Sequence, residues 1–72
     1  MVDKEEMIEI FEELYSNTKM EALTNSADIK GNRQLFGQIQ GFFIAMKMAV
    51  PLDMDEIQYV EHRLRMLEER IA

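Results

Sequence analysis

The side chains most able to do chemistry are few in this 72-residue sequence, and they lie apart. His62 is the only histidine, and cysteine is absent. Nucleophilic catalysis needs a hydroxyl or thiol beside a base, but on a helix His62 would have no serine or threonine three or four positions away. One histidine also cannot build a metal site alone. We therefore expect no enzyme, no metal and no cofactor, and interpret His62 as an exposed or interfacial residue.

Glutamates form the second candidate group. Four of them share one side of a predicted helix: Glu5, Glu9, Glu12 and Glu13. A hard cation needs oxygen ligands that converge from several directions, which one helix face does not supply, so the pattern favours a solvated acidic face. The same carboxylates leave one functional alternative open, an acidic inhibitor that mimics phosphate charge and binds a host nucleic-acid-processing protein.

Charge is distributed unevenly along the chain, whose net charge is −6. Residues 1–28 carry eight acids and two lysines, residues 29–52 carry three basic residues and no acid, and residues 53–72 carry six acids and three arginines. Nucleic acid and anionic membranes repel such a chain, so we expect direct binding to neither. The longest apolar run is far shorter than the roughly 20 residues of a membrane span, and the acidic N-terminus has no apolar leader segment. Both features predict a cytoplasmic protein.

A first helix, predicted over residues 4–24, positions the glutamates. Asp3 and Glu6 have the spacing of a capping box. Apolar residues recur at helical intervals away from the glutamates: Met7, Ile8, Phe11, Leu14 and Tyr15. Residues 16–18 are poor helix formers, so a break there is an alternative, but we favour a continuous helix. The turn-rich residues 25–32 then predict a loop.

A second helix is predicted over residues 33–49, beginning near Asn32 and ending before Pro51, because the residue preceding a proline is disfavoured in helical geometry. Large side chains share one broad face: Leu35, Phe36, Ile39, Phe42, Phe43, Met46 and Val50. Small residues recur at every fourth position on the other side and, with two larger neighbours, form the predicted self-association surface: Gly37, Gly41, Ile44, Ala45, Met48 and Ala49. Only a narrow sector containing Arg33, Gln40 and Lys47 is polar.

The small residues allow two interpretations. Stacked on a helix, they form a ridge that another backbone can approach closely, and such contact would offset the cost of about 1 kcal/mol for each glycine inside a helix. The approaching backbone could belong to another helix of the same chain or to a second copy. A short chain has few other residues to cover both sides of one helix. This favours self-association, with a dimer as the expected oligomer.

A third helix is predicted over residues 54–71. Asp53 and Glu56 repeat the capping-box spacing. Apolar residues then step by three and four positions, as in a coiled-coil seam: Ile57, Val60, Leu64, Leu67 and Ile71. A stripe on the far side combines residue types that are enriched at protein interfaces. This stripe is predicted to contact another protein: Tyr59, Arg63, Met66 and Arg70.

Together these elements predict one all-α domain of three helices over residues 1–72. The short link at Pro51 makes the second and third helices an antiparallel hairpin, and the first helix packs across it. Because the chain is short and has no disulfide, oligomerisation would complete its core. The expected function is non-enzymatic protein–protein interaction through self-association.

From Gln34 onward the layout resembles small helical accessory proteins encoded by tailed bacteriophages. The shared features are a Gly-x-x-x-Gly helix with interleaved glutamine and aliphatic residues (Gly37, Ile39, Gly41), a break at Pro51, and a charged heptad helix ending in residues 67–70. The resemblance covers roughly half of the chain. It implies a phage-encoded assembly or accessory factor that associates with itself or with virion or host proteins, in the host cytoplasm or the virion.

Overall fold

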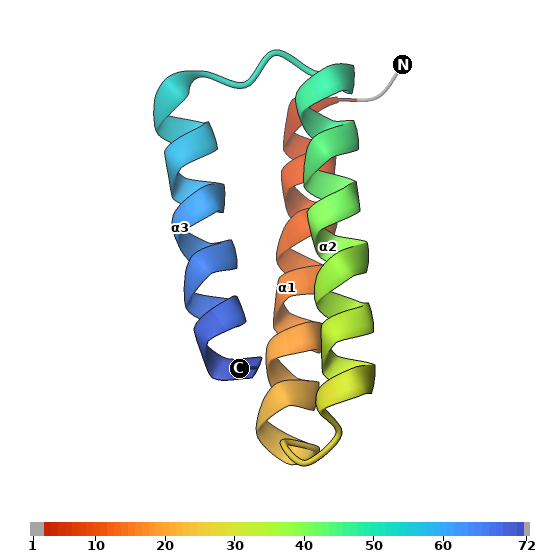
Figure 1. The fold of residues 1–72 in the computed structure, drawn as a ribbon. Coiled ribbons are helices and arrows are strands. Elements are labelled where there is room, and N and C mark those ends of the chain that lie inside the picture. The colour runs from red at the N-terminus through yellow and green to blue at the C-terminus, as the bar shows by residue number, and fades with distance from the viewer. Residues whose placement is uncertain (1–2, 72) are drawn as a thin grey trace.

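Three α-helices make up the computed structural model, which describes residues 3–71. They are α1 (Lys4–Thr24), α2 (Ile29–Ala49) and α3 (Met54–Ile71), and residues 3–71 contain no strand. α1 and α2 run side by side in opposite directions, and α3 is antiparallel to α2 (Figure 1). The prediction of an all-α fold with three helices is confirmed.

One stripe from each helix builds the core. Phe11 of α1, Ile39 and Met46 of α2 and Leu67 of α3 are the largest fully buried side chains. The predicted seam of α3 is buried at Val60, Leu64, Leu67 and Ile71. α2 contacts both other helices extensively, whereas the contact between α1 and α3 is thinner. α2 is therefore the central element of the bundle.

α1 passes through residues 16–18 without a break, as favoured from the sequence. Thr18 is buried, and its hydroxyl donates a hydrogen bond of 2.8 Å to the carbonyl oxygen of Leu14. This bond satisfies the buried hydroxyl within the helix. The capping-box spacing of Asp3 and Glu6 predicts that the Asp3 carboxylate accepts from the Glu6 amide. This prediction is wrong, because the carboxylate accepts from the Glu5 amide at 3.1 Å.

The predicted start of the second helix is wrong by one turn. The helix begins at Ile29, so the loop before it is shorter than the predicted residues 25–32. Asp28 caps α2, with its carboxylate 3.1 Å from the amide nitrogen of Gly31. A Cβ atom at position 31 would collide with this carboxylate, so the glycine makes room for the cap. Asn32 is therefore inside the helix, where its buried Nδ2 donates to the carbonyl oxygen of Asn25 at 3.0 Å and ties the loop to the helix.

The capping box at the start of α3 is confirmed. The Asp53 carboxylate accepts from the Glu56 amide at 2.8 Å, and the Glu56 carboxylate accepts from the Asp53 amide at 3.0 Å. The same Glu56 oxygen lies 3.1 Å from Lys4 Nζ. The cap of α3 is thereby linked to the first turn of α1.

Candidate interaction surfaces

The outer face of α2, by which we mean the six residues of the predicted self-association surface, lies on the outside of the bundle. All six are exposed: Gly37, Gly41, Ile44, Ala45, Met48 and Ala49. Ile44 is 56% exposed and Met48 is 84% exposed. A Cβ atom added at Gly37 or Gly41 would meet no other atom within 4 Å. Close packing of these glycines against another helix of the same chain is therefore excluded within residues 3–71.

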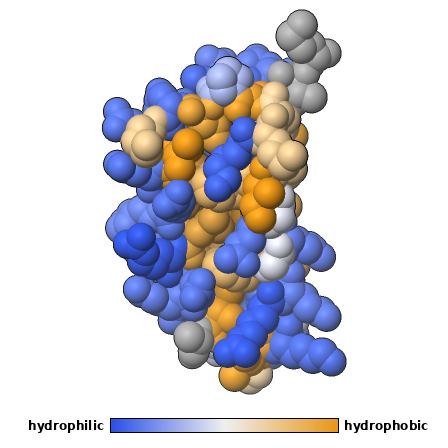
Figure 2. Space-filling model, turned by 45° about the horizontal axis from the view of Figure 1, so that its top comes forward, coloured by the Kyte–Doolittle hydropathy of each residue, from blue (hydrophilic) through white to orange (hydrophobic). Residues whose placement is uncertain are grey.

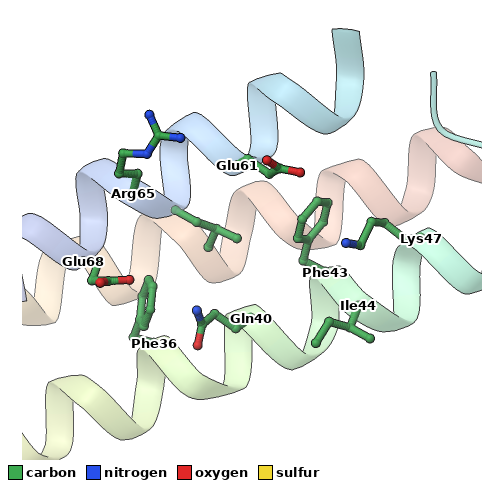
Figure 3. A pocket seen from close by; sticks show the side chains of 9 residues that line it. Phe36, Gln40, Phe43, Ile44, Lys47, Glu61, Arg65 and Glu68 are labelled. Carbon is green, nitrogen blue, oxygen red and sulfur yellow. The ribbon is translucent and has the colours of Figure 1, made fainter. Parts of the chain in front are cut away.

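A groove of about 560 Å³ runs between α2 and α3. The rings of Phe36 and Phe43 form its apolar floor (Figure 3), and Leu64 also lines it. Lys47 from α2 extends over the Phe43 ring, with Nζ 4.6 Å from the ring centroid. Hydrophobic atoms gather in a band between hydrophilic flanks on one face of the molecule (Figure 2). Ile44 belongs both to this groove and to the outer face of α2, so the two surfaces are continuous.

The α2 wall of the groove is basic, and the α3 wall carries two acids and one arginine. The α2 wall contributes Gln40 and Lys47, and Arg33 continues it past Phe36. The α3 wall contributes Glu61, Arg65 and Glu68. Within the described part of the chain, no ion pair crosses the groove. Sequence reasoning missed this site, since Glu61 and Glu68 face Lys47 and Arg33 only once the antiparallel register of α2 and α3 is known.

A polar cluster joins α1 to α3. The Arg63 guanidinium carbon lies 4.1 Å from the Tyr15 ring centroid and 5.2 Å from that of Tyr59. Arg63 Nη1 lies 2.9 Å from one carboxylate oxygen of Glu12 and donates to the other at 3.1 Å. The Tyr59 hydroxyl donates to Glu12 at 3.0 Å, and Arg63 also donates to the Tyr59 oxygen.

This cluster stabilises the charged form of Arg63. Partial burial disfavours the charge, but the hydrogen bond with Tyr59 and the attraction of Glu12 outweigh burial and raise the pKa of Arg63 above its ordinary value. The attraction between the Arg63 guanidinium and the Glu12 carboxylate joins α1 to α3.

The cluster includes two members of the stripe that was predicted to contact another protein. Tyr59 and Arg63 bind Glu12 of the same chain, and Met66 and Arg70 are the exposed members of that stripe outside the cluster. Contact of the stripe with another protein stays a prediction. Glu12 in turn is not part of a freely solvated face, because the α3 side chains bind it. Glu5, Glu9 and Glu13 are exposed as predicted.

Other functional features are sparse among residues 3–71. His62 is exposed, and no three His, Cys, Asp or Glu side chains of this range gather closely enough to hold a metal ion. Nor is any helix in the described range long and apolar enough to cross a bilayer. No protein-family model, curated protein or solved structure matches the chain. The resemblance to phage-encoded proteins stays a prediction.

Proposed function

We propose that this protein is a non-enzymatic interaction module that associates with a second copy of itself through the outer face of α2. The observation that carries this proposal is the exposure of the whole face, including Ile44 and Met48, on the helix that forms the centre of the bundle. Burying a large apolar side chain contributes about 1.5 to 3 kcal/mol. The resemblance to phage-encoded helical proteins supports an assembly or accessory role for the associated form.

The glycines favour association over a merely exposed apolar helix. Gly37 and Gly41 each weaken an isolated helix by about 1 kcal/mol relative to alanine, and no atom within residues 3–71 uses the space above them. A partner helix packed along α2 beside Ile44 and Met48 would approach the α2 backbone at these glycines. The stabilisation from that close contact would offset the intrinsic cost of the glycines.

Mass measurement over a concentration series tests the proposal. Between about 1 and 100 µM, where interfaces of modest affinity form, light scattering should show the mass rise from one chain of 8.5 kDa toward twice that value. Gly41→Leu should keep the mass near that of one chain, because leucine blocks the close approach. The fold should remain intact, since open space surrounds Gly41 and leucine is the better helix former.

Ser16→Leu is the matched control, because it adds the same side chain to an exposed position of α1, away from the outer face of α2. It should associate like the wild type. A wild-type mass of one chain across the whole series would overturn the proposal, as would unchanged association of Gly41→Leu.

A further inference from the structure

The outer face of α2 is too small to form a specific interface alone. It has six residues, of which Ile44 and Met48 are the large ones, whereas a stable interface uses roughly 20 to 30 residues on each side. The contact with a second copy must therefore extend to a neighbouring surface. Ile44 also lines the groove between α2 and α3, so the groove is the adjoining surface of suitable shape.

The charges of the groove are arranged in a definite order along its length. Lys47 of α2 and Glu61 of α3 lie toward one end, and Phe36 and Glu68 lie toward the other (Figure 3). Arg33 lines the continuation of the groove beside Glu68. Each end thus has a basic residue on the α2 wall and an acidic residue on the α3 wall.

Two-fold symmetry allows two ways of laying one such groove on another. If the symmetry axis runs parallel to the helices, α2 of each copy lies over the groove and α3 of its partner, and every residue keeps its level. Lys47 then meets Glu61 of the other copy, and Arg33 meets its Glu68. If the axis runs across the helices, α2 lies over α2 and α3 over α3, so that like charges face one another. Opposite charges meet only in the first arrangement, so charge complementarity favours a symmetry axis parallel to the helices.

We propose that α2 of a second copy occupies the groove between α2 and α3, with the two-fold axis parallel to the helices. This inference rests on the proposed self-association and specifies its geometry. Ile44 of each copy contacts the apolar floor of the other groove, and Lys47 and Arg33 pair with Glu61 and Glu68 across the interface. In this arrangement Gln40 lies level with Arg65 of the other copy and accepts a hydrogen bond from it.

Charge reversal and mixing test this arrangement. Lys47→Glu places two glutamates opposite each other at both symmetry-related contacts, and Glu61→Lys places two lysines there. Each variant alone should associate about tenfold more weakly than the wild type. An equimolar mixture of the two variants should recover the association of the wild type. In the mixed dimer, the introduced glutamate of one chain meets the introduced lysine of the other. The second contact of that dimer keeps one native pair, Lys47 with Glu61.

Mixing the two variants distinguishes a charge pair between chains from a charge pair within one chain. Lys47 and Glu61 line the same groove of one molecule, so a double variant could form a pair within one chain, whereas the mixture restores only pairs between chains. Both positions are exposed, and circular dichroism should show native helicity for each variant. Arg70→Glu, which changes an exposed α3 charge outside the groove, should not alter association.

The outcomes distinguish this inference from the proposed function. Recovery in the mixture supports the groove arrangement. Wild-type association by the single variants, or weakened association that mixing does not restore, overturns it. In either of those cases, a loss of association in Gly41→Leu would leave self-association through the outer face of α2 standing.

Discussion

Arg63 illustrates at the scale of single residues how one side chain can serve packing and charge at once. Its guanidinium stacks near Tyr15 and Tyr59 and pairs with Glu12. Isolated surface ion pairs contribute little, but here the cation is half-buried, lies near aromatic rings and donates to the carboxylate. Since the contact between α1 and α3 is the thinnest in the bundle, this cluster contributes to the attachment of α3.

Replacement of Arg63 tests that role. Arg63→Ala should lower the free energy of unfolding by about 1 to 2 kcal/mol, from the lost cation–π contact and charged hydrogen bonds. Arg70→Ala, an exposed arginine of the same helix, should stay within about 0.5 kcal/mol of the wild type. Chemical denaturation monitored by circular dichroism measures both. Equal effects of the two substitutions would show that the cluster does not stabilise the fold.

At the scale of helices, α2 explains most of the architecture. One side holds the large core residues that contact α1 and α3, one flank forms a groove wall, and the opposite side is the exposed outer face. Its start depends on two polar residues. Asp28 caps the helix, and Asn32, buried one turn later, holds the preceding loop by its bond to the Asn25 carbonyl.

Asn32→Asp tests the importance of this loop contact. Aspartate has the same shape, but when ionised it cannot donate to the Asn25 carbonyl, and a buried charge then faces an acceptor. We expect a loss of about 1 to 3 kcal/mol in the free energy of unfolding at neutral pH. Burial of the charge raises the pKa of this aspartate above the unfolded value of about 4. The loss should therefore shrink as the pH falls toward about 4 and be nearly absent below it, because the protonated carboxyl can donate again.

Asn17→Asp is the control for the added charge, since Asn17 is exposed on α1. It should change stability little at either pH. Urea denaturation at neutral and acidic pH, compared between the two variants, measures the effect of the buried contact. A small, pH-independent change in Asn32→Asp would show that the Asn25 carbonyl does not need this donor.

At the scale of the whole molecule, the charges are distributed unevenly between the helices. Glu5, Glu9 and Glu13 cover the outside of α1, while the segment from Ile29 to Leu52 has three basic residues and no acid. A second copy approaching the α2 side avoids the acidic α1 surface of its partner. This uneven distribution of charge favours assembly through the α2 side of the molecule over assembly through the α1 side.

Methionine oxidation reports on this assembly without any substitution. Met48 is 84% exposed on the outer face of α2, and Met20 is 65% exposed on α1. Peroxide converts exposed thioethers to sulfoxides, so in dilute protein both should react readily. In concentrated protein Met48 should be protected and Met20 should not, as measured by peptide mass spectrometry. Association without protection of Met48 would place the interface elsewhere.

Much of the helical architecture could be predicted from the sequence. Helix ends at residues 24, 49, 54 and 71 followed from local signals such as Pro51 and the Asp53–Glu56 box, and the buried stripe of α3 followed from its spacing. The start of α2 could not be predicted in the same way. Asp28 and Asn32 are both plausible caps, and the choice depends on the contact of Asn32 with Asn25 after the chain has turned.

The surface features also include some that could be predicted from the sequence and some that could not. The outer face of α2 was identified from the four-residue spacing of its small residues, because helical geometry alone places such residues on one side. The sequence by itself thus determined the three helices, apart from the start of α2, and the face that each one presents. Only the tertiary structure decided that Glu12, Tyr59 and Arg63 bind one another and that Lys47 and Glu61 flank one groove. Such pairings depend on which helices are neighbours and in what register, and packing across the whole chain sets both.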